Sequence, residues 1–366
     1  MGSDRENSRI KNAEDNEWAP ADPNSSKVVV NNSNAAWCPR VTVILPVFNA
    51  ERFLVQALQS IIAQSFEDFE LLAIDDGSID SSVEILSSLQ DPRLIIIKNE
   101  KNFGVVYTLN KGLAKARGDY VARMDADDIC HPLRLERQVK FLDSNPDVAV
   151  VGTWANIIDE FGNVFSSLSP PTNNVEIQRR LRYSNALIHP SVMIRGKFLK
   201  EIGNYHSLGR GAEDYDLWLR FAERFELANM PELLLDYRVH SEQISTKKIA
   251  AGFRTKQRVQ KLASQRCPQL WSNSAFSIWK QFSGLLTAAP GSLGYEYLDW
   301  AHTYLLAGKR KISCKLMLRS LLVAPLSIKA NAFARKMMFE CILGEGGVKV
   351  TRWYCNRIRS FFRNGI

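Results

Sequence analysis

The stretch Tyr120-Val121-Ala122-Arg123-Met124-Asp125-Ala126-Asp127-Asp128 decides the fold of this chain. Its first half is a short apolar-rich run that is typical of a buried strand. Three carboxylates then follow within four positions, at the point where that strand should end. Carboxylates so close together repel each other, so we expect a cation to compensate them. A hard divalent ion that also binds phosphate meets this need, and an acidic turn that caps the next helix is the alternative.

Strands and helices alternate along the chain before this stretch. Apolar runs predict strands at residues 40–46, 69–74, 94–97 and 120–123, and apolar spacings of three and four predict helices at 53–62, 81–89 and 105–116. Asn49 is expected close to the cap of the first helix. Such alternation is typical of parallel βαβ units, so we predict an α/β fold with a mostly parallel central sheet flanked by helices.

Polar loops follow three of these strands directly. Val47-Phe48-Asn49, Asp75-Asp76-Gly77-Ser78 and the acidic stretch at 125–128 should converge, because ligands of such sheets bind beyond the carboxyl ends of the strands. The chain has no GxGxxG after its first strand and no GxxxxGK[ST], which disfavours Rossmann dehydrogenases and P-loop enzymes. Acidic loops with a metal ion that bridges to phosphate remain as the way to hold a nucleotide.

A series of motifs in order resembles the family 2 glycosyltransferases, which have the GT-A fold. The similar segments are Leu45-Pro46-Val47-Phe48-Asn49, Asp75-Asp76-Gly77-Ser78, Asn102-Phe103-Gly104, Asn110-Lys111-Gly112, Ala116-Arg117-Gly118-Asp119, Met124 to Asp128, His189-Pro190-Ser191, Gly211 to Arg220 and Tyr237-Arg238-Val239-His240. They cover about residues 40–245, and Met124 to Asp128 stand where the family's DXD motif stands. The resemblance implies a nucleotide-diphospho-sugar transferase fold and an inverting, metal-dependent enzyme.

The resemblance also implies roles for individual residues. Those expected to bind the nucleotide sugar are Pro46, Val47, Asn49, Asp75, Asp76, Arg123, Asp125 and Asp127. A carboxylate at 75 or 76 can accept from the imide N–H of uracil, which favours a UDP-sugar without excluding other bases. Mn²⁺ or Mg²⁺ would be held by Asp127, by Asp125 directly or through water, and by His240, for which a purely structural role stays open.

Glu213-Asp214 opens a helix predicted over 213–225. Acidic residues in a first helical turn are favoured by the helix dipole, which is the structural explanation of the pair. The functional explanation takes Asp214 as the general base that accepts the proton of the acceptor hydroxyl, with Glu213 as its rival. Direct displacement at the sugar inverts the anomeric centre, so one base suffices.

The expected acceptor is a glycan or a lipid-linked molecule, in surface polysaccharide or glycolipid biosynthesis. Two other functions stay open at this point. A nucleotidyltransferase acting on sugar phosphates also uses acidic metal sites, but its first loop is typically glycine-rich and basic, unlike Pro46-Val47-Phe48-Asn49. A non-catalytic nucleotide-sugar-binding protein would have no use for Glu213-Asp214.

Charge divides the chain into three expected regions. Residues 1–38 are polar and predict a disordered leader, 39–245 form the transferase domain, and 246–366 form a mainly helical basic region. From Lys247 onward there are 21 Lys/Arg and 4 Asp/Glu, a net of +17, which leaves 26 basic and 35 acidic residues, a net of −9, before it. Arg352 to Arg363 interleave arginines with aromatic residues, which indicates contact with an anionic membrane or a solvated accessory face. No nucleic-acid-binding motif accompanies this charge.

The remaining signals concern the compartment. The start of the chain lacks the apolar core of a signal peptide, and no stretch approaches about 18 uninterrupted apolar residues. The six cysteines show no CxxC pair, which is typical of free thiols in a reducing compartment. We therefore expect a cytoplasmic protein, peripheral on the cytoplasmic face of the membrane and without a transmembrane segment.

Overall fold

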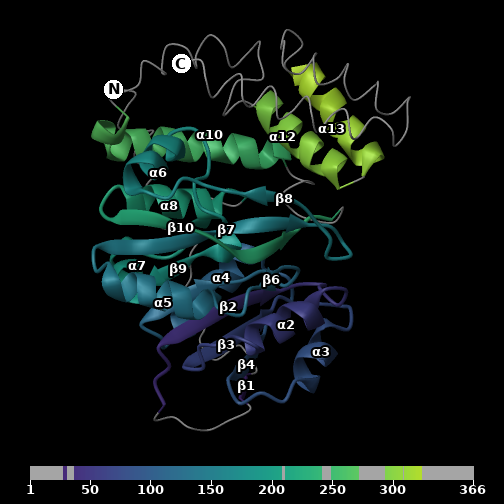
Figure 1. Cartoon of the computed structure of the whole chain (residues 1–366), viewed down its shortest axis with the longest axis vertical. Helices are drawn as coiled ribbons and strands as arrows, with labels where there is room; N and C mark the ends of the chain where they lie inside the picture. Colours follow the sequence, from purple (N-terminus) through teal and green to yellow (C-terminus); the bar gives the residue numbers. More distant parts are fainter. Residues whose placement is uncertain are drawn as a thin grey trace.

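The computed structural model describes residues 28–30, 37–207, 211–240, 249–271, 293–307 and 309–323. The segment Arg352 to Arg363, the domain boundary expected at 245 and most of the expected leader lie outside this part of the chain. Within it, a mixed sheet of ten strands runs through the centre and helices cover both faces (Figure 1).

The strands are β1 Val28–Val30, β2 Val41–Val47, β3 Phe69–Asp75, β4 Leu94–Lys98, β5 Tyr120–Arg123, β6 Ile129–Cys130, β7 Val148–Ile158, β8 Val164–Leu168, β9 Met193–Arg195 and β10 Glu226–Arg238. They lie in the order β1-β4-β3-β2-β5-β9-β7-β10-β6, with β8 paired to β7. β4, β3, β2 and β5 are parallel neighbours, as the alternating pattern predicts. Each of their predicted boundaries agrees with the structure to within one residue.

The helices are α2 Leu54–Ile62, α3 Ser82–Ser88, α4 Val105–Lys115, α5 Arg134–Ser144, α6 Asn174–Leu181, α7 Gly196–Ile202, α8 Glu213–Ala222, α10 Ile249–Arg266, α12 Leu293–Leu306 and α13 Arg310–Val323, with 3-10 turns at His189–Ser191 and Pro268–Leu270. Apolar side chains of α2, α3 and α5 pack on one face of the sheet. Those of α4, α6, α7, α8 and α10 pack on the other. The result is a three-layer α/β arrangement.

Strand β2 shows why the apolar runs are nearly continuous. Val41, Val43 and Leu45 belong to the core on the α2 side, while Ile44 belongs to the core on the α4 side. Successive side chains of a strand point to opposite faces, so a strand covered on both sides needs apolar residues throughout. Each such side chain contributes roughly 1.5–3 kcal/mol when it is fully buried.

The structure differs from the sequence predictions at two places. α2 begins after Phe53, so Asn49 does not cap it. Asn49 instead has a φ of 48°, its side-chain oxygen accepts from the N–H of Ile79 at 3.0 Å, and its own N–H donates to Ser78 Oγ at 3.0 Å. Asparagine tolerates this left-handed conformation, and the two hydrogen bonds of Asn49 connect the loop after β2 to the loop after β3.

Val28–Val30, in the expected disordered leader, pair antiparallel with β4.

The C-terminal helices pack against the α/β sheet. A third apolar cluster joins Ala301 and Tyr304 of α12 and Leu316 of α13 to Ile157 of β7 and to Val239, just after β10. Figure 1 shows α10, α12 and α13 together at one end of the molecule, with β1 at the other. No helix within the described ranges is both long enough and apolar enough to span a bilayer.

Candidate active site

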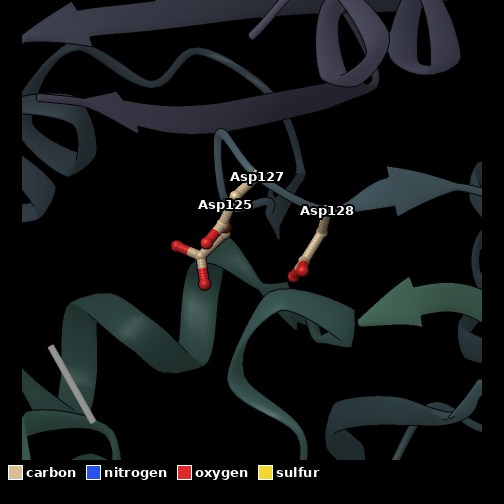
Figure 2. Close-up of side chains that lie close together, drawn as sticks. All are labelled: Asp125, Asp127 and Asp128. Carbon is tan, nitrogen blue, oxygen red and sulfur yellow. The ribbon is translucent and has the colours of Figure 1, made fainter. Parts of the chain in front are cut away.

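Three carboxylates gather in the loop between β5 and β6. Asp125, Asp127 and Asp128, which we call the carboxylate triad, each offer an oxygen, and these oxygens lie within 4.8 Å of one another (Figure 2). The far end of the loop is held in place because β6 pairs antiparallel with β10, with Cys130 opposite Leu235. The pairing of β6 with β10 therefore brings the three carboxylates close to the C-terminal end of β10.

Asp128 is the most buried member of the triad, at 1% exposure. Its Oδ1 accepts a 2.8 Å hydrogen bond from the backbone N–H of Arg238, and its Oδ2 has no hydrogen-bond partner among the described residues. Burial, followed by repulsion from Asp127 and Asp125, raises the pKa of Asp128 well above its usual range. An unpartnered buried oxygen beside two further carboxylates fits a divalent cation with oxygen ligands. The turn does not cap the next helix, because α5 begins only after Leu133.

His240 lies against the triad, 113 residues further along the chain than Asp127. Its Nε2 is 2.9 Å from Oδ2 of Asp127. The backbone oxygen of Asp127 accepts from Nε of Arg238 at 2.7 Å, and the ring of Phe53 packs 5.1 Å from the imidazole. The contact is compatible with either expected role of His240, as a metal ligand or as a purely structural residue.

Arg123 links the triad to the rest of the site. Its Nη1 donates to Oδ2 of Asp125 at 2.6 Å, and its buried Nε has no partner in the part of the chain described. Burial raises the pKa of Asp125, and the Arg123 guanidinium opposes that rise. Arg123 was expected to bind the nucleotide sugar, and its observed contact is with a carboxylate of the DXD motif.

Glu213 and Asp214 are the first two residues of α8. Asp214 accepts hydrogen bonds through Oδ2 from Nδ2 of Asn185 at 2.5 Å and through Oδ1 from the N–H of Tyr215 at 2.7 Å. Glu213 accepts from the N–H of Gly211 at 2.7 Å. Burial raises the pKa of Asp214, and burial together with the Asp214 charge raises the pKa of Glu213 to about 6. A raised pKa makes a carboxylate a better proton acceptor near neutral pH.

The two acidic groups interact electrostatically. The charge of Asp214 contributes to the raised pKa of Asp125, and the Arg123 guanidinium opposes the burial-driven rise in the pKa of both Glu213 and Asp214. The buried guanidinium of Arg123 therefore stabilises the charged forms of Asp125, Glu213 and Asp214. The structure brings together residues that the sequence separates by about 90 positions.

Asp75 and Asp76 differ in what they can still bind. Asp76 accepts through Oδ1 from Asn99 Nδ2 at 2.8 Å and from the N–H of Phe103 at 3.0 Å, and through Oδ2 from the N–H of Gly104 at 2.8 Å. Asp75 accepts only at 3.3 and 3.4 Å, from the N–H of Ser78, among the contacts described. Asp76 therefore holds the loop after β4, and Asp75 keeps more capacity to accept from a nucleotide.

The end of β2 presents its backbone and one aromatic ring. The side chain of Val47 is 1% exposed and its carbonyl accepts from the N–H of Asp76 at 2.8 Å, whereas Phe48 is 45% exposed. Pro46 is partly buried at the end of the same strand. Of the positions expected to contact the nucleotide here, Val47 has no accessible side chain, so its role is limited to shaping the loop.

Two supporting residues were missed by sequence reasoning. Asn185 lies in a loop and contacts Asp214 across 29 positions, so no local pattern could indicate it. Arg134 is 1% exposed and donates to the carbonyls of Arg123 at 2.8 Å and Val192 at 3.2 Å, which fixes the end of β5. A signal for Arg134 existed, because Arg134 and Gln138 occupy the apolar face of α5 at a spacing of four.

Comparisons with known proteins identify relatives of this chain. The model of glycosyl transferase family 2 matches residues 42–203. The uncharacterized glycosyltransferase MJ1057 of Methanocaldococcus jannaschii is 35% identical over 207 residues, which cover 55% of this chain and 71% of the relative. The O-antigen biosynthesis glycosyltransferase WbnJ of Escherichia coli is 33% identical over 221 residues, which cover 58% of this chain and 84% of the relative.

A solved structure shares the fold. The crystal structure of residues 1–349 of S. aureus TarS in complex with UDP-GlcNAc superposes with a TM-score of 0.50 at 18% identity, and the match covers 81% of this chain and 90% of that one. The relatives decide against a nucleotidyltransferase and in favour of an enzyme that transfers glycosyl groups. The chain has the GT-A fold and belongs to glycosyltransferase family 2.

Proposed function

We propose that this glycosyltransferase is a metal-dependent, inverting enzyme that uses a nucleotide-diphosphate sugar. The observation that carries the proposal is the carboxylate triad, whose oxygens lie within 4.8 Å of one another and whose Asp125 accepts from Nη1 of Arg123 at 2.6 Å. The raised pKa values of Glu213 and Asp214 at the start of α8 support it. The fold thus supplies both a triad that can bind a cation on a diphosphate and carboxylates with raised pKa values. This is the combination that transfer from a sugar diphosphate to a hydroxyl requires.

Asp214 is proposed as the general base. The acceptor oxygen forms a bond to C1 of the donor sugar while its proton passes to the carboxylate of Asp214. The bond between C1 and the diphosphate oxygen breaks, and its electron pair leaves with the nucleoside diphosphate. Attack opposite the leaving group inverts C1, and no covalent enzyme intermediate is needed. Asn185 holds Oδ2 of Asp214, which orients the carboxylate for this transfer.

The triad is proposed to hold Mn²⁺ or Mg²⁺. Asp127 would be the direct ligand, Asp125 would assist directly or through water, and the unpartnered Oδ2 of Asp128 adds a third oxygen. His240 lies close enough to Asp127 to complete the set. When bound, the ion supplies positive charge to the diphosphate oxygens.

The donor is proposed to be a UDP-sugar, with Asp75 accepting from the base and Asn49 shaping the loop beside it. Release of UDP from a panel of UDP-, GDP- and dTDP-sugars in the presence of Mn²⁺ tests this directly. We expect slow hydrolysis of at least one UDP-sugar and faster release once a hydroxyl acceptor is added. Release only from GDP- or dTDP-sugars would contradict the assignment of the base, and no release from any donor would contradict the proposed reaction.

The acceptor is proposed to be a glycan or a lipid-linked molecule of surface polysaccharide assembly, in line with the O-antigen relative. We also propose a cytoplasmic, membrane-peripheral enzyme whose arginine- and aromatic-rich segment at 352–363 contacts anionic lipid. Deletion of residues 350–366 should weaken flotation with vesicles containing phosphatidylserine, most clearly at low salt, because exposed charges are then least screened. Vesicles of phosphatidylcholine alone are the control, and unchanged flotation would leave the basic region as an accessory helical region.

A further inference from the structure

We propose that Tyr304 of α12 positions His240 at the carboxylate triad, so that the C-terminal helices complete the active site. The inference rests on the metal site described under the proposed function. It assigns a role to the basic C-terminal region that is independent of any membrane contact. Tyr304 acts through the backbone of His240 and is therefore a positioning residue.

A short chain of contacts connects α12 to the triad. The hydroxyl of Tyr304, which is fully buried, donates to the backbone oxygen of His240 at 2.7 Å. The imidazole of the same residue reaches Oδ2 of Asp127 at 2.9 Å. One hydrogen bond therefore separates the C-terminal helices from a side chain that directly contacts the DXD motif.

The backbone on either side of His240 is held from two directions. The N–H of Val239 donates to the carbonyl of Ile158 at 2.9 Å, which continues the pairing of β10 with β7. Val239 is 1% exposed and packs in the apolar cluster with Tyr304. The backbone at His240 therefore follows directly on the pairing of β10 with β7 and is itself held by a hydrogen bond from α12.

Ion pairs join the C-terminal helices to the α/β sheet region and to each other. Lys309, just before α13, pairs with Glu160 at 2.7 Å, and Glu160 also pairs with Arg52 at 2.5 Å beside the start of α2. Glu296 of α12 pairs with Lys256 of α10 at 2.6 Å. Such pairs define an orientation, while the buried apolar cluster supplies most of the binding energy. The position of the Tyr304 hydroxyl is therefore set by the packing of both helices.

Removal of this hydroxyl should change the metal site more than the fold. Tyr304→Phe keeps the buried ring and deletes one donor to a buried carbonyl. Partners that orient metal ligands typically change metal affinity by 10- to 100-fold. We expect the affinity for Mn²⁺ alone, measured by electron paramagnetic resonance titration, to fall by about 10-fold in Tyr304→Phe.

A matched control lies on the same helix. Tyr297 is 6% exposed, belongs to the same apolar cluster two helical turns away, and shows no hydrogen bond from its hydroxyl within the described ranges. Tyr297→Phe should leave the Mn²⁺ affinity unchanged. His240→Ala sets the size of the effect when the imidazole is lost altogether.

The His240 ring signals in nuclear magnetic resonance spectra of the metal-free protein give a second readout. They should shift in Tyr304→Phe and stay in place in Tyr297→Phe. Wild-type affinity in Tyr304→Phe alongside a loss in His240→Ala would overturn the inference, as would unchanged ring signals. Wild-type affinity in His240→Ala would overturn it as well, while leaving transfer by Asp214 intact. A wild-type protein that binds no Mn²⁺ would contradict the proposed metal dependence, and the ring signals then decide on Tyr304 alone.

Discussion

Asp214→Asn is expected to lower the turnover number by about 10²- to 10⁴-fold, the range that general acid–base catalysis contributes. An amide cannot take the proton of the acceptor hydroxyl, while its size and its place at the start of α8 are unchanged. Donor binding should therefore persist, because the carboxylate triad and the loops after β2 and β3 remain intact. Turnover of the donor and calorimetric binding of the nucleoside diphosphate measure the two effects separately.

Glu213→Gln is the comparison that identifies the base. In Glu213→Gln the side-chain amide oxygen can still accept from the N–H of Gly211, so the variant should keep its fold. It should also retain most of the turnover. A loss in Glu213→Gln larger than that in Asp214→Asn would move the role of base to Glu213. Equal small losses would contradict base catalysis by this pair.

The pH profile supports the same experiment. A general base must be deprotonated, so activity is present above the pKa of the base and is lost as pH falls through it. Burial raises the pKa of Asp214, and the pKa of Glu213 is about 6. The acid limb of kcat/KM should therefore lie above the usual carboxyl range of about 4. The residual activity of Asp214→Asn should show no such acid limb, because the variant lacks the titrating carboxylate.

The central sheet could be predicted from sequence because its signals are local. In β2 and β3, apolar residues alternate between two cores, and in α2 they recur at three and four positions. These patterns depend on burial alone, which periodicity reports directly. Helix α8 was predicted three residues too long, to Phe225, because Phe225 still packs against the apolar core although the helix has ended at Ala222.

The site could be predicted only in part, since its polar contacts join distant segments. The order of loops at the strand ends indicated Asp125 and Asp127, but the unpartnered oxygen of Asp128 depends on how β10 meets the loop. Asn185 and Tyr304 reach the site across 29 and 64 positions respectively. A single polar contact at such separation leaves no periodic trace, and only the packing of the chain determines it.

Asp127→Ala is expected to abolish metal-dependent donor binding, with an affinity loss above the 10- to 100-fold typical of residues that only orient a ligand. Calorimetry of UDP binding with and without Mn²⁺ measures it, because only the Mn²⁺-dependent part of the affinity should vanish. Asp119→Ala is the matched control, since Asp119 is an exposed aspartate just before the opposite end of β5. An unchanged affinity in the presence of Mn²⁺ would remove Asp127 from the metal site.

The stability of Asp127→Ala separates function from fold. Three carboxylates within 4.8 Å repel one another when no cation is bound. Removal of one carboxylate reduces this repulsion and so stabilises the metal-free protein. The contact of His240 with Asp127 is lost at the same time, which opposes this gain. We therefore expect the metal-free variant to unfold at the wild-type temperature or slightly above it, while Mn²⁺ raises the unfolding temperature of the wild type alone. A large fall in the unfolding temperature would show instead that the triad is a structural cluster whose charges the fold already balances.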